Sequence, residues 1–121
     1  MSKTSDNKDN KASYFYVLHC RDGTLYGGYT TDLTRRLNEH NEGIGAKYTR
    51  PQKRRPLKMI YAEAHGSRSE ATKAEAAFKK LARRQKDQYL ASNGVSRPYK
   101  EQKQCIVKEV RQLHENQSEK L

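Results

Sequence analysis

The chain has 121 residues, of which 25 are lysine or arginine and 14 are aspartate or glutamate, giving a formal net charge of +11 at pH 7. Only 33% of the residues are hydrophobic, and no stretch approaches the roughly 18 to 20 consecutive apolar residues of a membrane helix, which excludes a membrane span. The length fits one domain, and the positive charge favours a polyanionic partner, with nucleic acid as the leading candidate.

The two ends of the chain differ from its middle in composition. Residues 1–11 are almost entirely polar, so we expect a disordered tail, and they lack the apolar segment of a signal peptide, which favours a cytoplasmic location. Cys20 and Cys105 form no CxxC pair, which is typical of reduced cysteines rather than of a disulfide framework or a zinc site. We expect a folded domain over residues 12–92 and a partly helical extension over residues 93–121.

The domain is predicted to begin with a β-hairpin. Residues 13–20 and 24–30 are rich in aromatic and β-branched residues, and a turn ending in Gly23 separates them. If the turn has three residues, Gly23 takes the left-handed conformation, and Tyr16 and Tyr26 become diagonal neighbours on one face of the hairpin. A two-residue turn would put these tyrosines on opposite faces.

Two glycines in the second strand indicate a close approach. With a three-residue turn, Leu18 pairs with Tyr26 and Tyr16 pairs with Gly28. Because Gly27 and Gly28 would weaken a strand that had no use for them, we expect backbone or substrate to approach closely there.

A helix is predicted next, from a cap at Thr31 or Asp32 to about Asn41. Its inner face is apolar, yet Arg36 and His40 lie four residues apart and project together from the edge of that face. Either side chain alone would commonly be a satisfied boundary residue. Together with Glu75 on the second long helix, they make a functional site about as good an interpretation as a structural one.

Residues 42–56 are predicted to form a long loop that holds most of the densest basic cluster of the chain. Six basic residues and no acidic residue occur within twelve positions of one another. A solvated loop is the plainest interpretation of a charge run, but the missing acids within the folded region favour contact with phosphate. We therefore predict nucleic-acid binding by Lys47, Arg50, Lys53, Arg54, Arg55 and Lys58.

A third strand over residues 57–64 is predicted to lead into a second helix. Ser67-Arg-Ser-Glu70 matches a capping box, and the helix is expected to run to about Arg84, with residues 85–91 continuing it. Glu75 lies on the margin of the apolar stripe of this helix. A carboxylate there costs stability unless it finds a cation or a metal ion.

The end of the chain carries only a thin apolar stripe. Residues 99–115 place Ile106, Val110 and Leu113 at helical spacing, which predicts a last helix. The whole pattern is β-β-α-β-α plus this C-terminal helix. It predicts an α+β fold in which helices flank a three-stranded, mainly antiparallel sheet.

The order and spacing of these motifs resemble the GIY-YIG nuclease family, over about residues 13–90, and most closely its small stand-alone bacterial members. The motif residues are, in chain order, Tyr14-Phe15-Tyr16, Tyr26-Gly27-Gly28, Leu33 to Leu37, His40 and Glu75. The runs shared with the stand-alone members are residues 22–26, 30–36 and 45–50.

The resemblance implies a phosphodiester hydrolase that uses one divalent cation, Mg²⁺ or Mn²⁺. By position, Tyr16 and Tyr26 match the two motif tyrosines, and Arg36 matches the arginine of the pattern. His40 occupies a position that Tyr or His holds in relatives. Glu75 would hold the cation against the scissile phosphate, and Arg36 would contact a non-bridging oxygen.

Tyr16 would take a proton from the attacking water. A phenol with a pKa of about 10 is a poor base at neutral pH, so this step needs help from Tyr26, His40 or nearby cations. The family pattern is incomplete further along, because many relatives carry an asparagine about a dozen residues after the glutamate. This chain has Lys86 and Asp87 there, and we expect Lys86 to supply a charge in its place.

The leading interpretation is therefore a metal-dependent endonuclease or nickase that acts on DNA with weak sequence preference. The alternatives are a module of the same fold that binds DNA or RNA without chemistry, and an accessory protein associated with RNA. The joint presence of the five motif side chains favours the enzyme, because a binding module needs no negative charge at Glu75.

Overall fold

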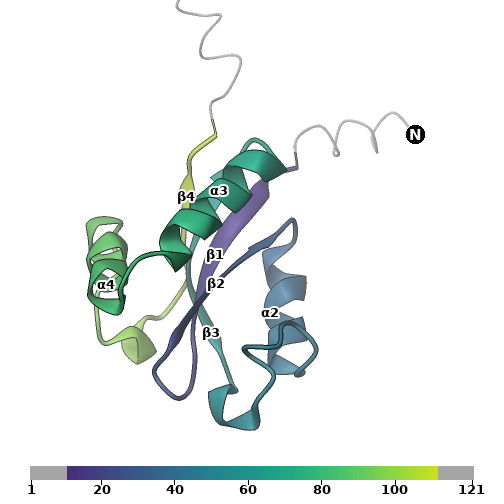
Figure 1. Cartoon of the computed structure of the whole chain (residues 1–121), viewed down its shortest axis with the longest axis vertical. Coiled ribbons are helices and arrows are strands. Elements are labelled where there is room, and N and C mark those ends of the chain that lie inside the picture. The colour runs from purple at the N-terminus through teal and green to yellow at the C-terminus, as the bar shows by residue number, and fades with distance from the viewer. Residues whose placement is uncertain (1–10, 112–121) are drawn as a thin grey trace, which may run out of the picture.

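The computed structural model describes residues 11–111 (Figure 1). Its elements are β1 (Ser13–His19), β2 (Leu25–Thr30), α2 (Leu33–Asn41), the short 3₁₀ helix η1 (Gln52–Arg54), β3 (Lys58–His65), α3 (Arg68–Lys79), α4 (Arg83–Ser92), η2 (Tyr99–Glu101) and β4 (Ile106–Glu109). Within this part of the chain, no helix has the length and apolar character needed to cross a membrane. Residues 1–10 of the predicted tail and residues 112–115 of the predicted last helix, Leu113 included, lie outside the described residues.

β1 and β2 form the predicted hairpin. They pair antiparallel with Tyr16 opposite Gly28 and Leu18 opposite Tyr26, which is the register of a three-residue turn. Gly23 closes the turn with a φ of 90°, in the left-handed region that glycine adopts without strain. The register confirms that Tyr16 and Tyr26 lie diagonally on one face of the sheet.

The sheet has four strands in the order β2-β1-β3-β4, and it is mixed. β1 pairs antiparallel with β2, as predicted, and also antiparallel with β3, whereas β4 pairs with β3 in parallel. The expectation of three strands is therefore wrong in number, although the α+β class is confirmed.

The predicted last helix is also wrong within the described residues. Residues 99–101 form only one 3₁₀ turn, and β4 follows, with Ile106 opposite Tyr61 and Val107 opposite Ala62. Ile106 and Val107 are adjacent β-branched residues, which suit an extended strand. Pairing with β4 also satisfies the backbone groups along the otherwise open edge of β3, a gain that the helical spacing of a few apolar residues does not reveal.

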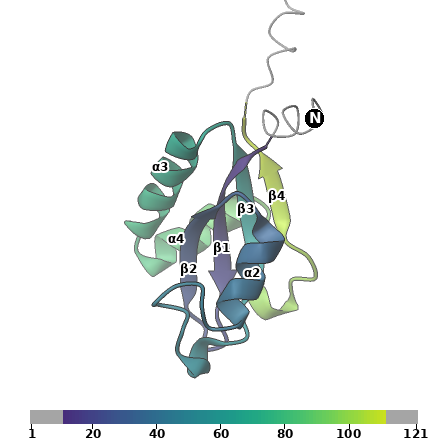
Figure 2. The same cartoon turned by 90° about the vertical axis from the view of Figure 1, so that its right-hand side faces the viewer.

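Helices cover both faces of the sheet, and Figure 2 shows α2 in front of the strands and α4 behind them. On one face, Tyr16 and Leu18 pack with Leu33 and Leu37 of α2. The other face carries the larger core cluster, which comprises Phe15, Val17, Leu25, Ile60, Tyr61, Phe78, Leu90, Val95 and Tyr99. Phe78 and Leu90 bring α3 and α4 onto this second face.

The helix ends follow local capping chemistry. Asp32 caps α2, its carboxylate accepting from the amide of Arg35 at 3.1 Å, and Ser67 caps α3 by accepting from the amide of Glu70 at 3.1 Å. The second helix stops earlier than predicted, at Lys79, because Ala82 is extended and begins α4 as a separate helix.

Candidate active site

Tyr16 lies at the centre of the site, in the middle of β1 and fully buried. Its ring crosses the neighbouring strand at Gly28, where a Cβ atom would come within 2.3 Å of the tyrosine hydroxyl oxygen. The expected close approach at this glycine is therefore made by the Tyr16 side chain itself. Any larger residue at this position would have to displace the phenol.

His40 joins Tyr16 in a directed chain of hydrogen bonds. His40 Nδ1 lies 2.7 Å from Thr49 Oγ1, and the Thr49 hydroxyl donates to the carbonyl of Ala46 at 3.2 Å. Since its proton goes to that carbonyl, Thr49 Oγ1 accepts from the N–H at Nδ1. Nε2 of the neutral ring then accepts from the Tyr16 hydroxyl at 2.8 Å.

Burial keeps both members of this pair neutral. It raises the pKa of Tyr16 to about 12, although the adjacent guanidinium of Arg36 opposes the shift. Burial also lowers the pKa of His40 to about 4, and here the positive charge of Arg36 acts in the same direction. At neutral pH the site therefore holds a phenol and an imidazole, without phenolate or imidazolium.

Arg36 is held beside the hydroxyl of Tyr16 and still has donors to offer. Its Nε donates to Tyr16 at 3.3 Å, Nη1 donates to Glu39 at 2.8 Å, and Nη2 donates to the carbonyl of Gly45 at 3.0 Å. A guanidinium has five N–H donors in one plane, so two remain for an anion. The side chain is partly exposed, which makes those donors accessible.

Tyr26 stands at the edge of the cluster in a stack of aromatic and cationic groups. Its ring lies 5.4 Å from the ring of His40 and stacks on the ring of Tyr48 at 5.7 Å. The guanidinium of Arg54 lies over the ring of Tyr48 at 3.8 Å, and Lys79 Nζ lies 5.2 Å from the Tyr26 ring. The stack gives the site an aromatic, positively charged rim.

Glu75 projects from α3 at the same rim. One of its carboxylate oxygens binds the ammonium of Lys79 at 2.9 Å, the lysine that also lies over Tyr26. The carboxylate is 20% exposed, and its negative charge acts on Tyr16 by adding to the rise of the tyrosine pKa. The structure therefore brings all five candidate catalytic side chains into one neighbourhood.

A metal ion at this site would have Glu75 as its protein ligand. Over residues 11–111, no three His, Cys, Asp or Glu side chains gather as a metal cluster. A hard cation such as Mg²⁺ or Mn²⁺ nevertheless suits a single carboxylate, since it keeps several waters and takes further oxygens from a phosphate. Oε1 of Glu75 makes no hydrogen bond or ion pair within the described residues and is open to such a cation.

The predicted basic cluster divides into two groups. Arg54 binds Asp22 at 3.2 Å and the carbonyl of Tyr48 at 2.7 Å, so it fastens the loop internally. Arg55 and Lys58 are likewise committed, to the carbonyls of Arg50 and Lys100 respectively. The side chains that are exposed and make no such bond within the described residues are Lys47, Arg50 and Lys53.

Lys86 stands apart from the motif side chains. Its ammonium lies 5.5 Å from the ring of Phe78, in the core that α3 and α4 share. Asp87, the next residue, accepts from Tyr99 at 2.6 Å and pairs with Arg83 at 3.2 Å. The position a dozen residues after Glu75 therefore serves the attachment of α4 to η2.

Three residues that complete the site carry no signal of their own in the sequence. Thr49 and Gly45 belong to the run 45–50, which matters only because it resembles the family, and Tyr48 reads as one more surface tyrosine. In the structure, Thr49 fixes the His40 ring, and a Cβ at Gly45 would come within 2.6 Å of His40 Nδ1. No periodicity marks such contacts, because the loop is irregular.

Fold and site together define a class of protein: a small α+β domain in which a neutral tyrosine–histidine pair, an arginine with free donors for an anion and a carboxylate lie together. Comparison with known proteins agrees. A model of the GIY-YIG catalytic domain matches residues 12–88. The chain belongs to the GIY-YIG family, a family of nucleases, and the resemblance seen in the motifs is confirmed. Membership implies nucleic acid as the substrate.

The relatives are small bacterial proteins. The chain is 66% identical over 83 residues to a UPF0213 protein of Enterococcus faecalis, covering 69% of this chain and 94% of that protein. It is 57% identical over 90 residues to the UPF0213 protein lmo0166 of Listeria monocytogenes, covering 74% of this chain and 91% of the relative. The solution NMR structure of the protein EF2693 from E. faecalis is similar, at 65% identity and a TM-score of 0.50, over 70% of this chain and 88% of that one.

Proposed function

We propose that this protein is a metal-dependent endonuclease or nickase that hydrolyses phosphodiester bonds in DNA with weak sequence preference. The observation that carries the proposal is the directed hydrogen-bond chain from Tyr16 through His40 to Thr49, beside the open donors of Arg36. A purely structural cluster needs neither a fixed proton direction nor a guanidinium with unused donors.

In this proposal, Tyr16 relays a proton instead of acting as a standing phenolate. The attacking water gives its proton to the Tyr16 oxygen while the Tyr16 proton moves to Nε2 of His40. The water oxygen bonds to phosphorus as the bond from phosphorus to the leaving oxygen breaks. The pKa of about 12 at Tyr16 disfavours a free phenolate, so a concerted transfer suits this residue. The pKa of about 4 at His40 makes its protonated form a strong acid, which returns the proton through the Tyr16 hydroxyl to the leaving oxygen.

Arg36, Tyr26 and Glu75 would serve the phosphate. The two remaining donors of Arg36 would hold a non-bridging oxygen, and Arg36 cannot lose its charge at any working pH. Tyr26 would pack against the substrate at the rim and support His40 through ring contact. Mg²⁺ or Mn²⁺ bound at Glu75 would neutralise the charge that develops on the leaving oxygen.

Nicking of supercoiled plasmid tests this function. We expect cleavage by the wild-type chain with Mg²⁺ or Mn²⁺, and a loss of about 10²- to 10⁴-fold in Tyr16→Phe and Glu75→Ala. Glu70→Gln on the same helix is the matched control and should cleave normally, because an amide oxygen can still accept from Gly66. No nicking across a range of metals would contradict the enzyme, and full activity of Tyr16→Phe would remove Tyr16 from the mechanism.

The second candidate is a binding module without chemistry, and the stack at the rim favours it. Tyr48 is 38% exposed beside the ring of Tyr26 and the guanidinium of Arg54, and the exposed part of this aromatic, cationic group can contact unpaired bases. Such a module would bind single-stranded DNA or RNA with or without metal, and Glu75→Ala would bind at least as tightly as the wild type. The plasmid assay and a binding assay in EDTA therefore separate the two functions.

A further inference from the structure

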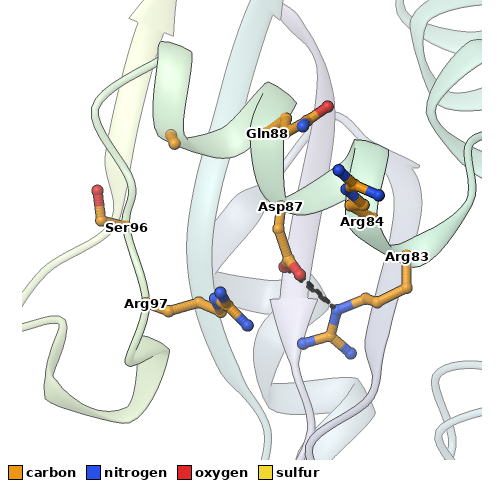
Figure 3. Close-up of a pocket in the computed structure, with 7 residues that line it drawn as sticks. Arg83, Arg84, Asp87, Gln88, Ser96 and Arg97 are labelled. Carbon is orange, nitrogen blue, oxygen red and sulfur yellow. Dashed lines mark hydrogen bonds and ion pairs between the residues drawn. The ribbon is translucent and has the colours of Figure 1, made fainter.

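A second basic region lies on α4, away from the tyrosine–histidine pair. A cavity of about 750 Å³ opens between α4 and the loop that leads into η2. Figure 3 shows Arg97 reaching from that loop toward Asp87 and Arg83 on the helix, with Arg84 and Gln88 along the same helix. Both helices of this face, α3 and α4, pack on the side of the sheet opposite α2.

The cavity continues into a second hollow of about 600 Å³, because Arg83 and Arg97 line both. The second hollow runs along the hairpin turn and is lined there by Arg21, and beyond Arg97 by Lys100. The two hollows form one groove, here called the α4 groove, from Arg84 on α4 to Arg21 on the β1–β2 turn.

Positive charge is in excess in the α4 groove, whose acids are Asp22 and Asp87 and whose basic residues are Arg21, Arg83, Arg84, Arg97 and Lys100. Asp87 is committed to Tyr99 and Arg83, and these partners hold its pKa below the ordinary value although burial opposes them. Arg84 and Arg97 are exposed and form no hydrogen bond or ion pair within the described residues, although the charge of Arg97 also acts on Asp87 and helps to lower its pKa. Two guanidiniums are thus left to face the same hollow with all their donors unused by the described part of the chain.

The pKa of the neighbouring His19 is lowered, partly by the same positive charges. Burial lowers the pKa of His19, which lines the second hollow, and the charges of Arg83, Lys58 and Lys100 lower it further, while Asp22 opposes them. A guanidinium without a carboxylate partner is suited to bind phosphate, because its planar fork binds phosphate oxygens through two parallel hydrogen bonds.

We propose that the α4 groove binds backbone phosphates of the nucleic-acid strand at a distance from the bond that is cut. The proposal rests on the proposed function in taking nucleic acid as the ligand. It assigns to Arg84 and Arg97 the direct phosphate contacts, with Gln88 and Ser96 as neutral donors beside them. The groove then extends the nucleic-acid-binding surface of a small domain beyond its active-site face.

The test is a comparison of binding by two doubly substituted chains of equal charge. Arg84→Gln/Arg97→Gln and the control Lys11→Gln/Lys73→Gln each lose two positive charges at exposed positions. Binding to a fluorescent duplex of about 30 base pairs is measured in EDTA over a range of salt, so that cleavage plays no part. We expect the groove variant to bind about tenfold more weakly and its salt slope to fall by about 1 to 2, with little change in the control.

Two further measurements, one on lysine variants that keep the charge and one with inorganic phosphate, show whether the groove binds the nucleic-acid backbone. Arg84→Lys/Arg97→Lys should recover most of the affinity, and thermal unfolding of each variant checks that the fold is intact. Equal losses in groove and control variants would overturn the proposal. A second pair of results would also overturn the proposal: inorganic phosphate shifts the NMR signals of the Arg84 and Arg97 Nε–H groups, but the groove variant binds the duplex as tightly as the wild-type chain does. The groove would then bind free phosphate only.

The binding result is independent of the chemistry. If no metal supports cleavage but the groove variant alone loses affinity, the groove stands and the enzymatic proposal fails. If the wild-type chain cleaves and the groove variant binds normally, the enzyme stands and the groove fails.

Discussion

At the scale of single residues, the site owes its character to burial more than to charge. Tyr16 and His40 are both fully enclosed, and each prefers its neutral form by about two pKa units or more. A neutral pair can exchange a proton within one hydrogen bond, whereas a buried phenolate or imidazolium would need a compensating ion.

The shifted pKa of His40 predicts a loss of stability in mild acid. Unfolded His40 binds a proton below about pH 6.5, whereas the folded residue resists protonation down to about pH 4. Between these pH values proton binding therefore stabilises the unfolded state relative to the folded state. The contribution of His40 is fully present above pH 6.5 and falls by about 3 kcal/mol as pH drops to 4. Urea unfolding at a series of pH values measures it.

The matched variant for this prediction is His40→Gln, which keeps hydrogen-bonding capacity but cannot titrate. Its free energy of unfolding should fall less between pH 6.5 and 4 than that of the wild type, since the acidic groups elsewhere titrate alike in both. Parallel pH curves for the two chains would show that His40 does not resist protonation in the fold.

Sequence reasoning reached much of the site at this scale. The pairing of Tyr16 with Gly28 follows from the turn length, and the shared edge of Arg36 and His40 follows from helical geometry. It could not reach Thr49, because hydroxyl-to-imidazole bonding depends on how an irregular loop folds over the helix. Likewise, no local pattern distinguishes a loop arginine that binds its own backbone, such as Arg54, from one that faces solvent.

At the scale of elements, the loop between α2 and β3 acts as the support of the site. It supplies Thr49 to His40, the carbonyl of Gly45 to Arg36, and Tyr48 to the stack on Tyr26. The basic residues of the loop are partly a means of folding it, because Arg54 ties it to the hairpin turn through Asp22.

Removing the Thr49 hydroxyl should take away the hydrogen bond that orients His40 without creating a cavity. Thr49→Val keeps the volume but leaves Nδ1 of the buried His40 without its partner, at a cost of about 1 to 3 kcal/mol in the free energy of unfolding. We also expect ¹⁵N NMR to show a mixed tautomer of His40, and plasmid nicking to slow.

The control is Thr72→Val on α3, whose hydroxyl, among the described residues, bonds only to carbonyls of its own helix. It should leave the His40 spectrum and the nicking rate unchanged. An unaltered His40 tautomer in Thr49→Val would show that the loop does not direct the proton of the imidazole.

The last strand shows the limit of sequence reasoning about elements. The apolar positions after residue 99 fit a helix on spacing alone, yet the chain instead completes the sheet beside β3. Strand pairing is a non-local gain, decided by which edge is open when the rest has folded, and a window of sequence does not contain that information.

At the scale of the whole molecule, the excess positive charge is distributed over both sides of the sheet. Lys47, Arg50 and Lys53 are exposed on the loop beside the active site, and Arg84 and Arg97 are exposed on the α4 groove. A charge of +11 spread in this way favours contact with a polyanion along an extended path rather than at one spot.

This distribution predicts a steep salt dependence of DNA binding. If each of the five exposed side chains neutralises one phosphate, affinity for duplex DNA should fall by about 10²- to 10³-fold between 50 and 200 mM salt. Fluorescence anisotropy with two duplexes of unrelated sequence measures both the slope and the sequence preference. A binding curve that stays flat over this salt range would contradict a phosphate-dominated interface.

The ring of Tyr16 lying across Gly28 has an evolutionary consequence. Two short motifs that stand twelve positions apart in the chain form a single interlocked unit, in which the absence of a side chain on one strand makes the space for the phenol of the other. Neither position can drift by itself: a methyl group at Gly28 would expel the hydroxyl from His40, and a lost tyrosine would leave a void over the glycine. A relative that keeps this site must therefore keep both the tyrosine and the glycine.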